Sequence, residues 1–147
     1  MRLVDTNVLL YSVNADFAEH KCALQYLRDQ REQGAGWAVS WPIIYEFLRV
    51  ATHRRVFSKP LRPDQAFKYL VDLFERDRVS ILVPTERHRE LLLRTIGELS
   101  RPAGNVFHDI ATAVLLREHG IREIVTADSD FLQFSFLKVI NPLLNAS

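Results

Sequence analysis

Residues 3–10 read Leu-Val-Asp-Thr-Asn-Val-Leu-Leu, and this stretch decides the fold class. Two apolar residues, three polar residues and a second apolar run predict a buried strand, a turn and the first turn of a helix. Asp5 would then lie at the carboxyl end of the strand, the edge where open α/β sheets bind ligands. Asp5, Thr6 or Asn7 could instead serve only as the cap of the helix, because all three side chains suit that position.

The remainder of the chain alternates between strand-like and helix-like segments. Further strands are expected at residues 37–40, 79–83, 123–126 and 138–140. After the helix that follows Asp5, further helices are expected at residues 17–33, 42–51, 63–74, 91–99 and 109–119. Thr85 is expected to cap the helix that carries residues 91–99, and residues 100–107 to form a loop. This order predicts an α/β fold with a mainly parallel central sheet flanked by helices on both faces, in one domain spanning residues 1–147.

Composition excludes several classes of protein. The chain has 147 residues, of which 48% are hydrophobic and 25% are charged, as in ordinary globular proteins. No apolar run approaches the roughly 18 residues that span a membrane, and no secretory signal is expected. Cys22 is the single cysteine, which rules out an internal disulfide and any cysteine-based zinc site. A cytoplasmic location fits best.

The net charge of +1 does not by itself indicate nucleic acid, but its distribution is uneven. Residues 49–62 contain no acid, and their cations are Arg49, Arg54, Arg55, Lys59 and Arg62. This segment is either a solvated loop or a surface that contacts phosphates or an acidic partner.

Acidic residues recur where the predicted strands end and the helices begin. The carboxyl ends of parallel strands meet at one edge, so residues far apart in sequence could lie together there. The acids in question are Asp5, Glu46, Asp109, Asp128 and Asp130. Carboxylates held close repel one another, and a divalent cation with oxygen ligands, Mg²⁺ or Mn²⁺, removes that penalty. Glu46 could alternatively be an exposed residue at the rim of a helix.

One or two such ions would polarise a phosphodiester and activate water for its hydrolysis, leaving a 5′-phosphate. Thr6, Asn7 and Thr126 could orient the carboxylates or their waters, or could simply be cap and turn residues.

Four segments together resemble the PIN-domain ribonucleases and, within them, the VapC toxins. They are VDTNVL at 4–9, IYEFL at 44–48, HDIATA at 108–113 and VTADSDF at 125–131. Position by position, the resemblance implies metal-binding acids at Asp5, Glu46, Asp109 and Asp128, with Asp130 as a further, more distant acid. It also implies supporting polar residues at Thr6, Asn7 and Thr126.

The resemblance implies a biological role as well. It suggests a homodimeric endoribonuclease that uses Mg²⁺ or Mn²⁺ and inhibits translation by cutting structured RNA such as tRNA or rRNA. It further implies a VapB-type antitoxin whose tail occupies the active-site groove. The basic residues of segment 49–62 are the candidate RNA-binding surface.

Three other readings compete. A phosphatase with an aspartyl nucleophile would need a second Asp two positions after Asp5, where Asn7 stands. A receiver-like signalling domain would need an acidic pair at the first strand, which is absent, although Lys138 precedes a late strand. A PIN-like fold without catalysis would bind RNA or a partner only. The products of incubation with RNA distinguish these readings.

Overall fold

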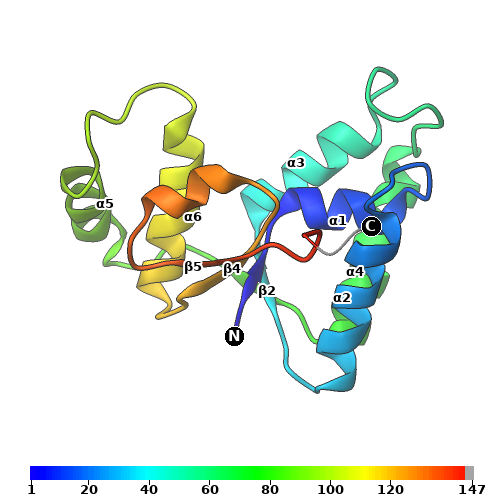
Figure 1. Ribbon diagram of the computed structural model, residues 1–147, viewed down its shortest axis with the longest axis horizontal. Helices are drawn as coiled ribbons and strands as arrows, with labels where there is room; N and C mark the ends of the chain where they lie inside the picture. The colour runs from blue at the N-terminus through cyan, green and yellow to red at the C-terminus, as the bar shows by residue number, and fades with distance from the viewer. Residues whose placement is uncertain (145–147) are drawn as a thin grey trace.

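A parallel sheet forms the centre of the computed structural model, which describes residues 1–144 (Figure 1). Its five strands lie in the order β3-β2-β1-β4-β5, and every neighbouring pair is parallel. The strands are β1 (Leu3–Val4), β2 (Ala38–Ser40), β3 (Ser80–Leu82), β4 (Glu123–Val125) and β5 (Lys138–Ile140). The predicted parallel α/β sheet is confirmed. The expected domain extends to residue 147, and residues 145–147 lie outside the described part.

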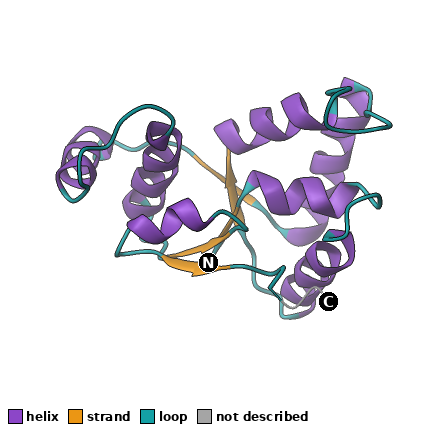
Figure 2. Ribbon diagram, turned by 45° about the horizontal axis from the view of Figure 1, so that its top comes forward, coloured by secondary structure: helices purple, strands orange, loops and turns teal. Residues whose placement is uncertain are grey.

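Helices cover both sides of this sheet, as predicted (Figures 1 and 2). The helices α1 to α4 gather on one side, and α5 and α6 pack against each other on the other side. The helices are α1 (Thr6–Val13), α2 (His20–Glu32), α3 (Trp41–Ala51), α4 (Pro63–Asp77), α5 (His88–Gly97), α6 (Val106–Glu118) and the short 3₁₀ helix η1 (Ser129–Gln133). Within residues 1–144, none of the helices has the length and apolarity that a membrane span requires.

The core lies between the sheet and these helices. The strands β1 and β2 are buried at every position, as expected of central parallel strands covered on both faces. The largest fully buried side chains include Trp37, just before β2, Ile124 in β4, and Phe47, Leu70 and Ile110 in helices on both sides of the sheet. The apolar face of each helix therefore fixes its position, and the polar edge of the sheet is left for chemistry.

Several predicted helix boundaries and one predicted cap were wrong. Helix α6 begins at Val106 and not at Asp109, so Asp109 lies in the first helical turn. Helix α2 begins at His20 and not at residue 17, because Phe17 leaves the helix to pack its ring between those of Tyr11 and Phe57. Thr85 does not cap α5, which starts three residues later.

Candidate active site at the carboxyl edge of the sheet

Strands β1 and β4 bring the first and last predicted motifs together. Leu3 pairs with Ile124 and Val4 with Val125, and the backbone N–H of Asp5 donates to the carbonyl of Val125 at 2.9 Å. Asp5 and Thr126, 121 positions apart in the chain, therefore leave the sheet side by side.

Asp5 is both a helix cap and a member of the acidic group. Its Oδ1 accepts from the backbone N–H of Thr6 at 2.8 Å, and its Oδ2 accepts from Thr126 Oγ1 at 2.8 Å. Burial raises the pKa of Asp5 above its ordinary value. The hydrogen bonds from Thr126 and Thr6 oppose this rise, whereas the charges of Asp128 and Glu46 add to it. The cap and the acidic-site alternatives are thus not exclusive.

Asn7 and Thr126 tie the two motifs to each other. Asn7 Nδ2 donates to Thr126 Oγ1 at 3.0 Å, and Asn7 Oδ1 accepts from the backbone N–H of Ala127 at 3.1 Å. Thr126 Oγ1 also accepts from the backbone N–H of Asp128 at 3.0 Å. Both side chains therefore orient acidic residues. The Thr6 hydroxyl makes no hydrogen bond to any residue in 1–144.

Asp109, Asp128 and Asp130 form the closest acidic group. Each offers one carboxylate oxygen, and these oxygens all lie within 4.8 Å of one another. Asp128 also caps η1, with Oδ1 accepting from the backbone N–H of Asp130 at 2.9 Å. Both acids of the Thr-Ala-Asp-Ser-Asp segment thus belong to the group.

The electrostatics of this group fit a divalent cation. Burial raises the pKa of Asp109 to about 6, and the negative charges of Asp128, Asp130 and Asp5 contribute to the shift. A carboxyl that resists ionisation because of its neighbours is stabilised in its charged form by a cation. Oxygen ligands alone suit Mg²⁺ or Mn²⁺. The residues present therefore fit the metal that the sequence predicts.

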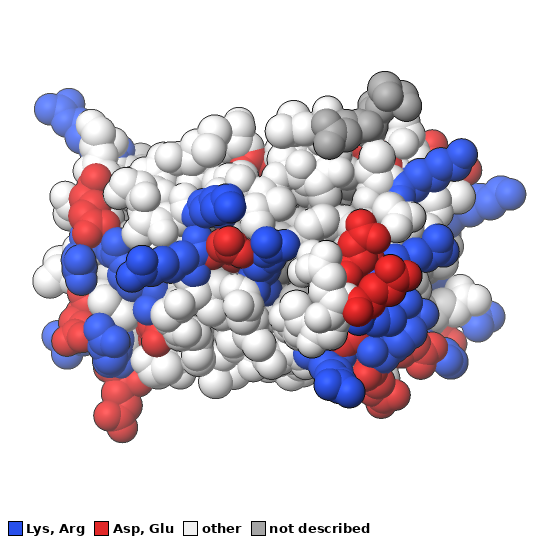
Figure 3. All heavy atoms as spheres, turned by 60° about the horizontal axis from the view of Figure 1, so that its bottom comes forward, with Lys and Arg blue, Asp and Glu red and all other residues white. Residues whose placement is uncertain are grey.

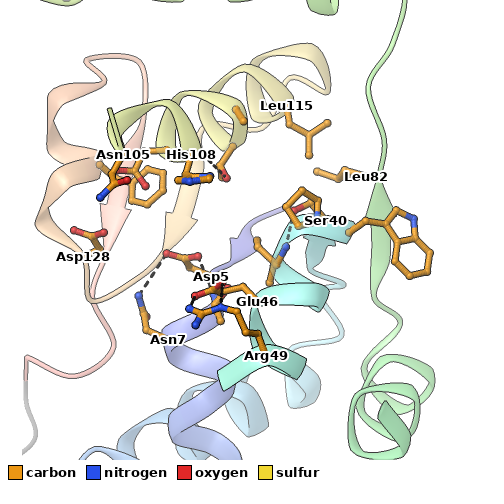
Figure 4. A pocket seen from close by; sticks show the side chains of 18 of the residues that line it. Asp5, Asn7, Ser40, Glu46, Arg49, Leu82, Asn105, His108, Leu115 and Asp128 are labelled. Atoms are coloured by element: carbon orange, nitrogen blue, oxygen red, sulfur yellow. Dashed lines mark hydrogen bonds and ion pairs between the residues drawn. The ribbon is translucent and has the colours of Figure 1, made fainter. Parts of the chain in front are cut away.

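Glu46 is placed differently from the three close acids. Its carboxylate receives two hydrogen bonds from Arg49, with Nη2–Oε1 at 2.6 Å and Nε–Oε2 at 3.1 Å. This bidentate pair lowers the pKa of Glu46. In Figure 4, Glu46 and Arg49, which are both on α3, lie beside Asp5 and across from Asp128.

A groove of about 960 Å³ runs over these residues (Figure 4). The predicted site residues that line it are Asp5, Thr6, Asn7, Glu46, Arg49, Asp109 and Asp128. Thr126 is fully buried beneath it. Of the basic segment, only Arg49 lines the groove, and Arg62 pairs with Asp64 at the start of α4. The predicted basic surface and the acidic site are therefore separate, except at Arg49.

Among the residues that the structure describes, the opposite edge of the sheet carries a smaller pocket of about 230 Å³ and no acidic group like that of Asp109, Asp128 and Asp130. Figure 3 views the molecule from the amino ends of the strands, where basic and acidic side chains are interspersed. Ion pairs at this edge include Arg2 with Glu123 and Arg31 with the buried Asp77.

Two histidines at the groove were not predicted. His108 lines the groove and precedes Asp109 in its motif, so its position next to a predicted acid could have indicated it. His88 also lines the groove, and its Nδ1 lies 2.9 Å from Glu118 Oε2. No local pattern joins His88 to Glu118, which are 30 positions apart on different helices.

Comparison with known proteins gives consistent matches. Residues 2–137 match the PIN domain model. Ribonuclease VapC33 of Mycobacterium tuberculosis is 32% identical over 146 residues, covering 97% of this chain and 99% of that protein. Ribonuclease VapC37 of the same species is 32% identical over 142 residues, covering 97% of both.

Solved structures share the fold. VapBC2 from Rickettsia felis, bound to a DNA fragment from its promoter, has a TM-score of 0.66 at 18% identity, covering 95% of this chain and 97% of that chain. FitAcB from Neisseria gonorrhoeae has a TM-score of 0.67 at 15% identity, covering 97% and 98%.

Proposed function

Because the chain belongs to the PIN domain family and to its VapC ribonucleases, we propose that the groove is the active site of a metal-dependent endoribonuclease. The observation that carries this proposal is the close approach of Asp109, Asp128 and Asp130 beside Asp5 at the carboxyl edge. The reaction is hydrolysis of a phosphodiester bond within RNA, which releases the 3′-oxygen and leaves a 5′-phosphate.

Asp109, Asp128 and Asp130 would hold the Mg²⁺ or Mn²⁺, with Asp5 and Glu46 adjoining. When bound, the ion supplies charge that polarises the phosphodiester and makes water more acidic. Thr126 and Asn7 keep the carboxylate of Asp5 in one orientation, so it need not reorganise when substrate arrives.

Arg49 is the best-placed cation for RNA. Its guanidinium lines the groove while it holds Glu46, so it can meet a phosphate next to the scissile one. Arg54, Arg55, Lys59 and Arg62 would extend the contact to the backbone of a structured RNA such as tRNA or rRNA.

The proposed biological role is that of a toxin that inhibits translation. The solved structures that share the fold include VapBC2 from Rickettsia felis and VapBC-1 from Haemophilus influenzae. By analogy, a VapB-type antitoxin would cover the groove of this protein, which would act in the cytoplasm and form a homodimer.

Cleavage of total bacterial RNA by the purified protein tests the activity. We expect discrete fragments with 5′-phosphates in Mg²⁺ or Mn²⁺, and none in EDTA or with Asp109→Asn, because the amide keeps the shape but removes the charge. Circular dichroism of the variant would control for folding. Fragments that persist in EDTA and in the variant would contradict the proposal. Tight RNA binding without cleavage would favour the binding-module alternative.

A further inference from the structure

The groove extends well beyond the acidic residues. In Figure 4, Asp128 and Asn105 lie at one end, and Asp5 and Glu46 lie in the middle. Leu82 and Leu115 lie at the far end. All of these residues line one continuous groove. An endoribonuclease acts on a strand that continues on both sides of the cut, so flanking nucleotides must lie along such a groove.

The far end has a different chemistry from the acidic end. Ser40 pairs with Leu82 in the sheet, so Trp41, Pro42 and Pro84, which follow these two residues, lie at this end of the groove. His88 lies there too, because it contacts Glu118, about one helical turn beyond Leu115. None of these lining residues carries a carboxylate. The indole ring of Trp41 is flat and mostly apolar, the proline and leucine side chains are apolar, and His88 alone among these lining residues has a side-chain nitrogen that can accept a hydrogen bond. An apolar pocket with one directed polar group suits a neutral, planar ligand.

Trp41 lines this part of the groove and is partly exposed. It is the first residue of α3, directly after Ser40, whose Oγ caps the helix by accepting from the backbone N–H of Ile43. Trp41 is 45% exposed, whereas the other tryptophan of the chain, Trp37, is 1% exposed. An aromatic ring that is held by a capped helix yet left open is suited to stacking with a base.

His88 is held by a buried carboxylate. The Glu118 side chain is fully buried, and its Oε1 accepts from the backbone N–H of Thr85 at 2.8 Å and from Thr85 Oγ1 at 2.9 Å. Burial opposes ionisation of Glu118, but the hydrogen bonds from His88 and Thr85 hold its pKa below the ordinary value. An ionised carboxylate only accepts hydrogen bonds, so Nδ1 of His88 carries the hydrogen and Nε2 remains for a ligand. Within residues 1–144, Nε2 has no hydrogen-bond partner.

We propose that the far end of the groove is a nucleobase subsite, in which an unpaired base of the RNA substrate stacks on Trp41 and is hydrogen-bonded by Nε2 of His88. This inference rests on the proposed function. Glu118 and Thr85 are positioning residues, since they act through His88. The subsite recognises the base next to the cut, whereas the acids act on the phosphate.

Quenching of tryptophan fluorescence by nucleotides tests the subsite. AMP, CMP, GMP and UMP contain no bond that the enzyme could cut, and each is titrated in Mg²⁺ with excitation at the red edge of the indole band, where nucleotides absorb little. We expect saturable quenching that differs among the four bases. Ribose 5-phosphate, which has no base, should not quench. Equal quenching by ribose 5-phosphate would assign the site to phosphate and overturn the proposal.

Variants connect the signal to the two side chains. Trp41→Phe should abolish the quenching, because Trp37 is buried. His88→Ala should raise the half-saturating concentration about fivefold, the worth of one hydrogen bond. The matched controls are Tyr45→Ala, on the same helix and 69% exposed, and His119→Ala, whose Nε2 lies 2.8 Å from the Val83 carbonyl oxygen. Neither control residue lines the groove, so both should behave as wild type.

The possible results distinguish a failure of the subsite proposal from a failure of the proposed nuclease activity. Cleavage of RNA without quenching by any nucleotide would refute the subsite and leave the nuclease intact. Base-dependent quenching without cleavage would support the subsite and contradict the nuclease. If Trp41 becomes less accessible as the protein concentration rises, and nucleotides then no longer bind, this face contacts a second copy of the chain. That result would overturn the proposal. In cleavage assays, His88→Ala should raise KM more than it lowers kcat and change the preferred base beside the cut.

Discussion

Asp5 and Asp109 belong to the same site but differ in the hydrogen bonds that their carboxylates accept. Asp5 is more deeply placed, but Thr126 and Thr6 donate to its carboxylate and favour its charged form. The Asp109 carboxylate accepts no hydrogen bond from any residue in 1–144, and its pKa is raised to about 6. Asp109 is therefore the acid whose charge depends most on a cation.

The raised pKa of Asp109 predicts how the metal-free protein responds to pH. The folded state binds this proton more tightly than the unfolded state, whose ordinary pKa is 3.8, so stability falls as pH rises through about 6. In EDTA, we expect the free energy of unfolding to fall by up to about 1 kcal/mol between about pH 5 and 7, after allowance for solvent screening.

Thermal unfolding at the two pH values measures this effect, with Asp109→Asn as the comparison. The variant should lose less stability over the same interval, because its amide does not ionise. An identical loss of stability in both proteins would show that the proton responsible for the pH dependence is bound by a residue other than Asp109. Mg²⁺ added at the higher pH should restore stability to the wild type.

At the scale of elements, Asp77 fastens the ends of α2 and α4 to the start of β2. Its fully buried side chain accepts from Arg31 Nε at 2.5 Å and from Trp37 Nε1 at 3.3 Å. Arg78, which follows, adopts a left-handed conformation with φ 56°, and this ends α4 and turns the chain toward β3. These contacts at the amino edge fix the strands that deliver Ser40 and Leu82 to the groove.

Asp77→Ala is expected to lower the free energy of unfolding by about 3 kcal/mol, because it leaves the indole N–H of Trp37 buried without a partner and Arg31 without its carboxylate. Urea unfolding measures the change. Asp72→Ala on the same helix removes only an exposed pair with Lys68 and should change stability by less than about 0.5 kcal/mol. Equal effects would show that the buried contacts of Asp77 contribute little.

At the scale of the whole molecule, the acidic site and most of the proposed RNA-binding cations lie in different places. The acids gather in the groove between the two groups of helices, where they would repel RNA without a cation. The cations of segment 49–62 other than Arg49 lie outside the groove, where they can contact a large RNA without neutralising the acids. The cations proposed to attract RNA are therefore separate from the acids proposed to bind the metal.

Arg54→Ala combined with Arg55→Ala should weaken RNA binding and reduce the slope of log affinity against log salt by about one to two, because each phosphate contact releases counterions. Binding of RNA to Asp109→Asn at several salt concentrations measures the slope without cleavage. Arg28→Ala combined with Arg122→Ala removes two cations outside the segment and serves as the control. An unchanged slope in the first variant would assign the segment to solvent or to a protein partner.

The sequence alone determined the features that depend on local order. The apolar pairs and triplets predicted the strands, their alternation with helices predicted parallel pairing, and that pairing implied a shared edge for Asp5, Asp109 and Asp128. Local patterns suffice here because the period of a strand or helix and the direction of its chain are set by neighbouring residues.

Only the tertiary structure decided which partner each polar side chain takes. Thr85 could have capped α5, but Glu118 from α6 binds both its N–H and its hydroxyl. The same carboxylate orients His88, and the basic segment is left outside the groove except at Arg49. Competition between a local partner and one from a distant element depends on how helices pack, because burial strengthens the contact that excludes water.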